Sequence, residues 1–223
     1  MQEFATPTPI AVVLDIAAGR IRLVAGERAD TTVEVSPADS GRDRDVKTAK
    51  DTRVACADGV LRIETPRDGN RLFGPSGAIE VVVHLPAASR LEAKAAGAGL
   101  TTTGRLDEVV VKAAQGPVEI EQARTARITL QDGDVTIGRL EEDGELTTAR
   151  GDIRVTEAAA GAVVLSTQSG SITIGAAPET AATLDARTSY GRVSNALRNT
   201  EGKDAGLRIR ATTSHGDISA HSN

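Results

Sequence analysis

The 223-residue sequence predicts an all-β fold, a β-solenoid or β-helix-like stack of repeats of about 18 residues behind an N-terminal β cap region. Three observations lead to this prediction. A short motif recurs at a near-constant spacing, apolar and polar residues alternate with period two around it, and aromatic residues make up only 1% of the chain. The core must therefore be aliphatic, which suits a narrow coil.

The recurring motif is a glycine, a polar residue or proline, Val or Ile, a second polar residue and then, in most copies, an aliphatic residue. Four copies match closely, at residues 116–120, 133–137, 151–155 and 170–174, and two weaker copies begin at Gly191 and Gly216. With one degenerate early copy, the central apolar residues are Leu100, Val118, Val135, Ile153, Ile172, Val193 and Ile218. Their near-constant spacing lengthens only at the end, which is typical of repeats that take extra residues into loops.

Each repeat also has a first half. Val163, Leu165 and Thr167 precede Gly170 at alternate positions with mainly polar residues between them, a pattern typical of a strand with one buried face. A glycine at a fixed place indicates a bend that no side chain allows. The predicted structural corner glycines are Gly116, Gly133, Gly151, Gly170, Gly191 and Gly216.

Two strands in about 18 residues are compatible with a hairpin or with one coil of a stack. Only Asp132-Gly133 is a favoured hairpin turn, so we favour coils whose equivalent strands pair in register. One ladder would then contain Val118, Val135, Ile153, Ile172, Val193 and Ile218 in that order. A second would contain Thr148, Thr167, Thr188 and Thr213, with the hydroxyls bonding along it.

Residues 1–90 are β-rich but less periodic. Strands are expected at residues 10–14, 20–24, 31–35, 52–57, 60–64 and 79–85, a short helix at 39–50 and a loop at 66–78. No linker separates this part from residues 91–223. We therefore expect one structural unit, 1–223, made of an N-terminal β-rich cap region (1–90) continuous with β-solenoid repeats (91–223).

Several runs resemble a known family. They are Ile-Glu-Val-Val-Val-His-Leu-Pro at 79–86, Arg-Leu-Glu-Ala-Lys-Ala at 90–95, the recurring Gly-Asp-Ile/Val strands, the opening at 9–14 with 19–23, and the ending at 213–218. Together they resemble the bacterial DUF4097 family of β-strand repeat proteins, whose label is "putative adhesin". The resemblance implies a β-solenoid-like fold without established activity, and it supplies no site residues.

Composition excludes several classes of function. The net charge of −5 argues against nucleic-acid binding driven by charge, and one cysteine, Cys56, excludes an internal disulfide framework. No apolar run is long enough for a membrane helix and no secretory signal is evident, so we expect a cytoplasmic protein without direct membrane insertion. We expect no cofactor, no metal and no small-molecule ligand.

Three features of the sequence contain residue types that occur in catalytic or metal sites. Ser214-His215-Gly216-Asp217 places triad residue types together, but neighbours on a strand point to opposite faces, so a polar corner is the favoured interpretation. Aspartates after the corner glycines would suit calcium only as an unbroken ladder, and Pro117, Ser171 and Arg192 interrupt it. Cys56 has no second cysteine near it and no residues at the spacing of a metal site, so we expect it to be a small buried apolar side chain.

The sequence thus favours a non-enzymatic scaffold or protein-binding module with a protein partner or self-association. A candidate partner-contact loop lies in the insertion at 195–206, with Leu197, Arg198, Lys203 and Asp204. Two alternatives remain open. One is head-to-tail self-assembly through a terminal coil containing Ile209, Ala211 and Ile218, and the other is an enzyme of the β-helix lyase or hydrolase type.

Overall fold

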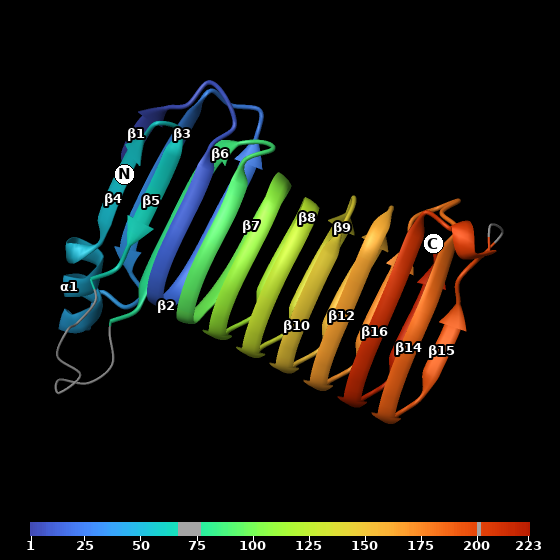
Figure 1. Ribbon diagram of the computed structural model, residues 1–223. Helices are drawn as coiled ribbons and strands as arrows, with labels where there is room; N and C mark the ends of the chain where they lie inside the picture. The colour runs from blue at the N-terminus through green and yellow to red at the C-terminus, as the bar shows by residue number, and fades with distance from the viewer. Residues whose placement is uncertain (67–76, 200–201) are drawn as a thin grey trace.

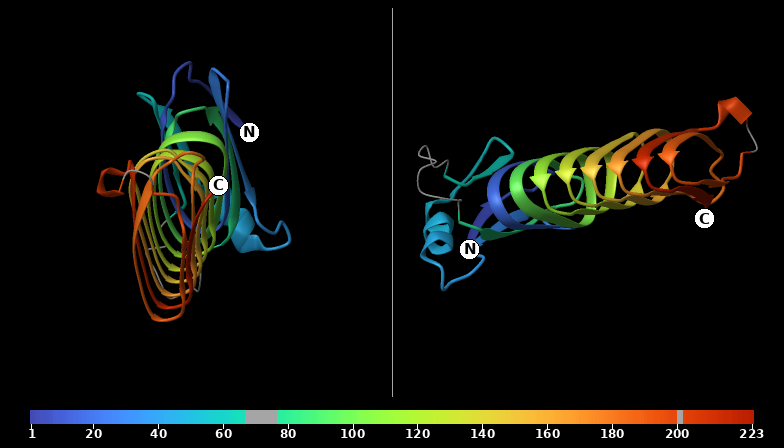
Figure 2. Two further views of the ribbon diagram at one scale, coloured as in Figure 1. Left: turned by 90° about the vertical axis from the view of Figure 1, so that its right-hand side faces the viewer. Right: turned by 90° about the horizontal axis from the view of Figure 1, so that it is seen from below.

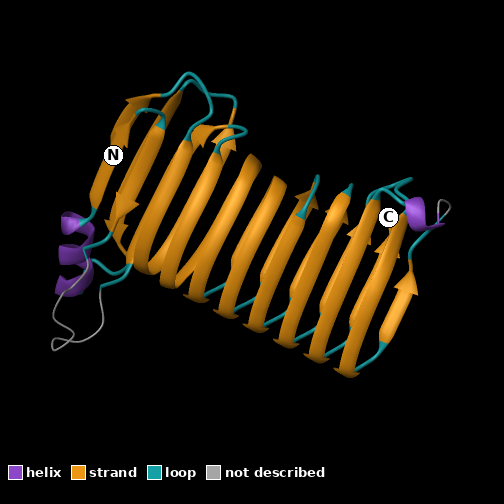
Figure 3. Ribbon diagram, in the orientation of Figure 1, coloured by secondary structure: helices purple, strands orange, loops and turns teal. Residues whose placement is uncertain are grey.

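A computed structural model describes residues 1–66, 77–199 and 202–223 of the chain. The described residues form one hydrogen-bonded sheet of 17 strands, with α1 at one end of the molecule and the short 3-10 helix η2 at the other (Figure 1, Figure 3). The predicted all-β class is confirmed. The elements are β1 (Gln2–Ala5), β2 (Ala11–Gly26), β3 (Asp30–Pro37), α1 (Asp43–Asp51), β4 (Arg53–Ala57), β5 (Val60–Glu64), β6 (Ile79–Pro86), β7 (Arg90–Gln115), β8 (Val118–Asp132), β9 (Val135–Leu140), β10 (Gly144–Arg150), β11 (Ile153–Ala158), β12 (Gly161–Ser169), β13 (Ile172–Ala176), β14 (Ala182–Tyr190), β15 (Val193–Ala196), η2 (Gly202–Asp204), β16 (Leu207–His215) and β17 (Ile218–Ser222).

β2 and the strands from β7 onward pair in parallel with their equivalents in the neighbouring repeats, and each repeat adds a strand to two faces. Seen along the long axis, the strands trace nested ovals (Figure 2). We call one such oval a coil. The strands before each glycine pair in the order β7, β8, β10, β12, β16, β14. Those after it pair in the order β7, β8, β9, β11, β13, β17, β15.

The last two coils are not stacked in sequence order. β16 lies between β12 and β14, and β17 lies between β13 and β15, so the final coil of the chain is the penultimate coil of the stack. The expected order of the apolar ladder is therefore wrong at its end, where Ile218 precedes Val193. The expectation that Ile209, Ala211 and Ile218 form the exposed terminal coil is wrong for the same reason, because all three are buried.

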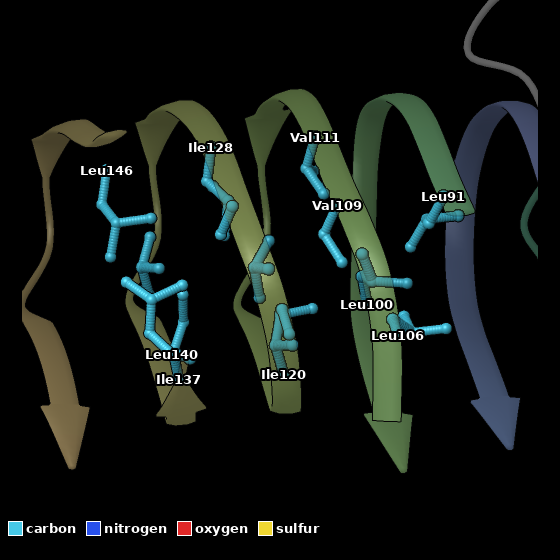
Figure 4. Packing of buried hydrophobic residues seen from close by; sticks show 14 of the residues in the cluster. Leu91, Leu100, Leu106, Val109, Val111, Ile120, Ile128, Ile137, Leu140 and Leu146 are labelled. Atoms are coloured by element: carbon cyan, nitrogen blue, oxygen red, sulfur yellow. The ribbon is translucent and has the colours of Figure 1, made fainter. Parts of the chain in front are cut away.

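The core is an aliphatic column that runs the length of the stack. Figure 4 shows a part of it, from Leu91 to Leu146. Its central ladder consists, in spatial order, of Val81, Ile21, Leu100, Val118, Val135, Ile153, Ile172, Ile218 and Val193. All but the last are at most 3% exposed. Fully burying a Val, Ile or Leu side chain contributes about 1.5–3 kcal/mol. The repetition of such a residue at the same position of each coil therefore accounts for much of the stability of the fold.

The corner glycines form a second ladder in which consecutive coils nearly touch. At Gly170 the backbone φ is +152°, and a Cβ atom would lie 2.0 Å from the carbonyl oxygen of Gly151. At Gly133 the φ is +146° and the distance to the carbonyl oxygen of Gly116 would be 2.3 Å. The same close approach occurs at Gly116, Gly151, Gly191 and Gly216.

The threonines stack beside these corners, but their hydroxyls do not bond to one another as expected. Thr148 donates to the carbonyl of Gly133 at 3.1 Å, and Thr167 donates to that of Gly151 at 3.1 Å. Thr213 and Thr188 repeat the contact with Gly170 and Gly216. Each threonine hydroxyl lies next to the carbonyl of a corner glycine in the neighbouring coil. The bend exposes this carbonyl oxygen, which is therefore available to accept the hydrogen bond.

The N-terminal part closes its end of the stack. β2 is continuous over two strands predicted separately, at 10–14 and 20–24, and Gly19 bends it with a φ of +131°. β3 and β4 pair antiparallel with β6 and β5, β1 pairs antiparallel with β3, and α1 contacts β3 and β6. The predicted helix at 39–50 begins later than expected, and residues 67–76 of the predicted loop lie outside the described residues.

Replacing a corner glycine by alanine tests the close approach of the coils. We expect Gly170→Ala to lower the free energy of unfolding by about 3 kcal/mol or more, because the methyl group meets a backbone carbonyl. The matched control is Gly97→Ala in β7, where a Cβ atom has no neighbour within 4 Å. Urea denaturation followed by circular dichroism measures both. Equal stability of the two variants would contradict the corner geometry.

Engineered disulfides test the order of the last coils. In a Cys56→Ser background, we expect the pair Ser166→Cys and Thr212→Cys to crosslink, because these residues are direct partners on β12 and β16. The pair Ser166→Cys and Arg187→Cys should stay reduced, since β16 separates their strands and doubles the distance of about 4.8 Å between neighbours. Non-reducing electrophoresis distinguishes them, and the opposite result would restore sequential stacking.

Candidate functional site

The aspartates that follow the corner glycines bind the backbone of the next coil. Oδ1 of Asp134 accepts the amide N–H of Asp152 at 2.8 Å, and Oδ1 of Asp152 accepts that of Ser171 at 2.7 Å. Asp217 accepts the amide N–H of Arg192 at 2.8 Å. These carboxylates hold the corners together. Among the described residues, no three His, Cys, Asp or Glu side chains gather closely enough to hold a metal ion.

The Ser214–Asp217 segment does not converge on one site. The imidazole ring of His215 stacks on the ring of Tyr190, with centroids 5.0 Å apart and an interplanar angle of 11°. Asp217 instead contacts Arg192, whose backbone N–H and guanidinium hold the pKa of that carboxyl below its ordinary value. The other histidines, His84 and His221, lie on β6 and β17.

Cys56 lies half-buried on β4 in the N-terminal part. Burial raises the pKa of its thiol, which keeps the sulfur protonated and weakly nucleophilic. It lines an open hollow of about 520 Å³ together with Phe4 and Asp58. The environment therefore matches a small packed side chain better than a reactive one.

In the predicted contact loop at 195–206, the described residues 195–198 contact β14 and β17. The amide N–H of Leu197 donates to Oδ1 of Asn195, that of Arg198 donates to Oγ of Ser222, and that of Ala182 donates to the carbonyl of Arg198. Leu197 packs half-buried against the core, whereas Arg198 and Asp204 are exposed. The Lys203 side chain lies outside what the structure describes, so two of the three predicted contact residues that are described, Arg198 and Asp204, are exposed to solvent.

A network of charged side chains lies at the bend opposite the glycines, and the sequence analysis did not predict it. The guanidinium of Arg105 donates two hydrogen bonds to the carboxylate of Glu141, both at 2.9 Å, across an intervening coil. Gln122, in that intervening coil, donates to Glu141 at 2.8 Å. Arg124 forms ion pairs with both Asp107, at 2.6 Å, and Glu142, at 2.9 Å. The sequence does contain a signal for this network, because Arg105, Gln122 and Arg139 are spaced by about one repeat.

The face made by β8, β10, β12 and β16 carries two adjacent rows of outward side chains without charge. The first row pairs Thr129, Thr147, Ser166 and Thr212 directly across the four strands. The second row, nearer the glycine corner, contains Gln131, Ala149, Gln168 and Ser214. Val164 lies beside them and is 40% exposed. We call these rows and Val164 the uncharged face.

Charges surround the uncharged face. Arg127 pairs with Glu145 at 3.0 Å along one side, and Arg150 pairs with Asp132 at 2.8 Å along the other. Arg210 contacts Asp185 at 3.5 Å near the end of the stack. On the opposite face the equivalent central row contains the charged residues Glu119 and Arg154. The two faces therefore differ in the position of their charges, since the uncharged face has none in its central row over four consecutive coils and the opposite row is interrupted by two.

The pKa of Glu141 predicts a pH-dependent contribution to stability. Arg105 above all, and then Gln122, lower the pKa of this carboxyl from 4.5 to about 2 against the opposing effect of partial burial. The network therefore stabilises the fold above pH 4.5 and loses this contribution as the pH falls toward 2. We expect Glu141→Gln to cost about 1 kcal/mol at pH 7, since solvent screens the partly exposed pair.

The measurement is urea denaturation of Glu141→Gln and the unchanged chain between pH 7 and pH 2. The stability difference should shrink as the pH falls. Glu108→Gln is the matched control because Glu108 is an exposed acid on the same strand as Arg105. A stability difference that persists unchanged at low pH would show that the network contributes no charge pairing.

Comparisons with known proteins bear on this architecture. No helix in the described part of the chain is long and apolar enough to cross a membrane, and no curated protein matches the sequence. A solved structure from Bacteroides fragilis NCTC 9343 is similar at a TM-score of 0.57 and 15% identity, covering 98% of this chain and 95% of that one. One from Parabacteroides distasonis ATCC 8503 is similar at 0.51 and 14% identity, with the same coverage.

Both of those structures are described as a "putative adhesin", and at these identities they show a shared fold alone. The sequence itself gives the more specific result. The family model of the Toastrack DUF4097 proteins matches residues 93–221, which contain all six predicted corner glycines. The chain belongs to the Toastrack DUF4097 family.

Proposed function

We propose that the chain is a non-enzymatic β-solenoid scaffold that binds a protein partner on the uncharged face. The observation that carries the proposal is the neutral centre of that face, which spans four consecutive coils and is bordered by ion pairs. Protein interfaces have the same anatomy, since charged residues are depleted at their centre and polar residues form a wet rim.

The regular stacking supports this proposal. Neighbouring coils are about 4.8 Å apart, so the side chains of one row are held at fixed intervals by a rigid backbone. Such a surface loses little conformational entropy when a partner binds, and Thr, Ser and Gln side chains can donate and accept hydrogen bonds. The adhesin description of the two similar structures names a class of proteins that act by binding, which agrees with this proposal.

An enzyme of the lyase or hydrolase type is the second candidate because one hollow combines acids with an arginine. It measures about 700 Å³ and is lined by Asp15, Asp51, Arg53 and Glu64. Asp51, Arg53 and Glu64 are exposed, however, and exposed carboxylates lack the desolvation that tunes catalytic acids and bases. We rank this candidate below the binding module for that reason.

A photo-crosslinking amino acid at Ser166 tests the binding proposal, with Thr173 as the matched position on the opposite face. We expect one protein, identified by mass spectrometry, to be captured from Ser166 and not from Thr173 in the cell of origin. With that purified protein, Ser166→Arg should weaken binding at least about tenfold in calorimetry, and Thr173→Arg should change it less than about twofold. Equal effects of the two substitutions would refute the assignment of the face.

A further inference from the structure

The two ends of the stack are covered very differently. At the N-terminal end the last apolar side chains, such as Val33 and Leu61, are at most 2% exposed beneath antiparallel strands and α1. At the other end Val193 is 47% exposed, although its ladder neighbour Ile218 is fully buried. Leu184 and Ala186 on β14 are also only partly buried. The core column therefore ends at an open face.

The strands at this open face have unused edges. Within the described residues, β14 has β16 as its one strand neighbour, and β15 has β17. Among the described residues that follow β15, Arg198 contacts the beginning of β14, where its carbonyl accepts the amide N–H of Ala182. Edges of this kind pair with another strand unless a proline, a bulge or charged side chains protect them. β14 contains no proline, and its two charged residues, Asp185 and Arg187, are of opposite sign.

We propose that a second copy of this chain covers the open face, with β14 of the two copies paired antiparallel in a two-fold symmetric, tail-to-tail dimer. The charge pattern of β14 carries the choice of occupant. Asp185 and Arg187 are exposed and flank Ala186 symmetrically. Within one chain Asp185 has only solvent-exposed contacts of 3.5 Å, with Arg187 and Arg210, so its carboxylate can also pair across a dimer interface. If Ala186 faces its own equivalent, Asp185 faces the partner subunit's Arg187, and Arg187 faces the partner subunit's Asp185. The edge is therefore complementary to itself in the antiparallel direction.

The same symmetry completes the core. A two-fold axis that crosses both faces of the stack brings β15 toward the partner subunit's β15 while it pairs the β14 strands. Val193 and Leu184 would then lie in the middle of a continuous apolar column of twice the length. Because the N-terminal ends are covered, the assembly closes at two chains instead of growing into a fibre. This inference does not depend on the partner proposed for the uncharged face.

Sedimentation velocity of the purified full chain between about 1 and 100 µM tests the proposal. We expect a dimer that dissociates on dilution. Arg187→Asp places two acids opposite each other and should raise the dissociation constant at least about tenfold. The double variant Asp185→Arg, Arg187→Asp reverses the charge pattern but keeps it self-complementary, so it should form the dimer again. This result distinguishes a loss of charge pairing in Arg187→Asp from a loss of folding stability. Arg154→Asp on β11, an interior strand of the opposite face, is the matched control and should leave the dimer unchanged.

Three results would overturn the proposal. A monomer at every concentration would mean that the open face has no self-partner. Assemblies that keep growing with concentration would indicate head-to-tail contact. A dimer that resists Arg187→Asp, or that Arg154→Asp disrupts equally, would place the contact elsewhere on the molecule.

Discussion

The close approach of consecutive coils at the glycine corners is the constraint on which the rest of the structure depends. The carbonyl oxygen of one corner occupies the space where a side chain of the next would begin, so only glycine permits the contact. Once the corners are fixed, the threonine hydroxyls and the aspartates beside them have carbonyl and amide partners at one repeat distance. A one-residue slip would break all of these bonds together, and the register is therefore strongly specified.

The interior follows from the same spacing. Coils about 4.8 Å apart leave room for stacked Val, Ile and Leu but little for rings, which explains the scarcity of aromatic residues. At the opposite bend the glycines are interrupted by larger residues, and the loops vary in length. Backbone hydrogen bonds join the coils there too, such as the one from the amide N–H of Glu141 to the carbonyl of Ala123 at 3.0 Å. Arg105 and Arg124 add ion pairs with acids one or two repeats away. Both edges of the molecule are thus held by backbone contacts, and this one by ion pairs as well.

Much of this fold could be predicted from sequence because the repeat signal is local. The strands, the corner glycines and the apolar ladder all follow from residues within one period.

The order of the last two coils could not be predicted from the ladder, since a periodic pattern fits equally well in either order. The signal that distinguishes them is Asn195, which occupies the inward position of Ala220 in the neighbouring coil. A polar inward residue costs less at the open end than between two coils, so the coil with Ile209 and Ala220 is enclosed instead. The charged network and the uncharged face depend on which strands become neighbours, and the sequence spacing suggests them only after the coils are placed.

The inserted position of β16 and β17 changes how the chain can reach its final shape. Most of the stack can assemble during synthesis, as each coil adds to the one before it. β14 and β15, however, have no strand to dock on until β16 and β17 have been made. This end of the stack is therefore completed in one late step that orders two coils together. A chain interrupted before Leu207 would leave two coils without their place in the stack instead of one.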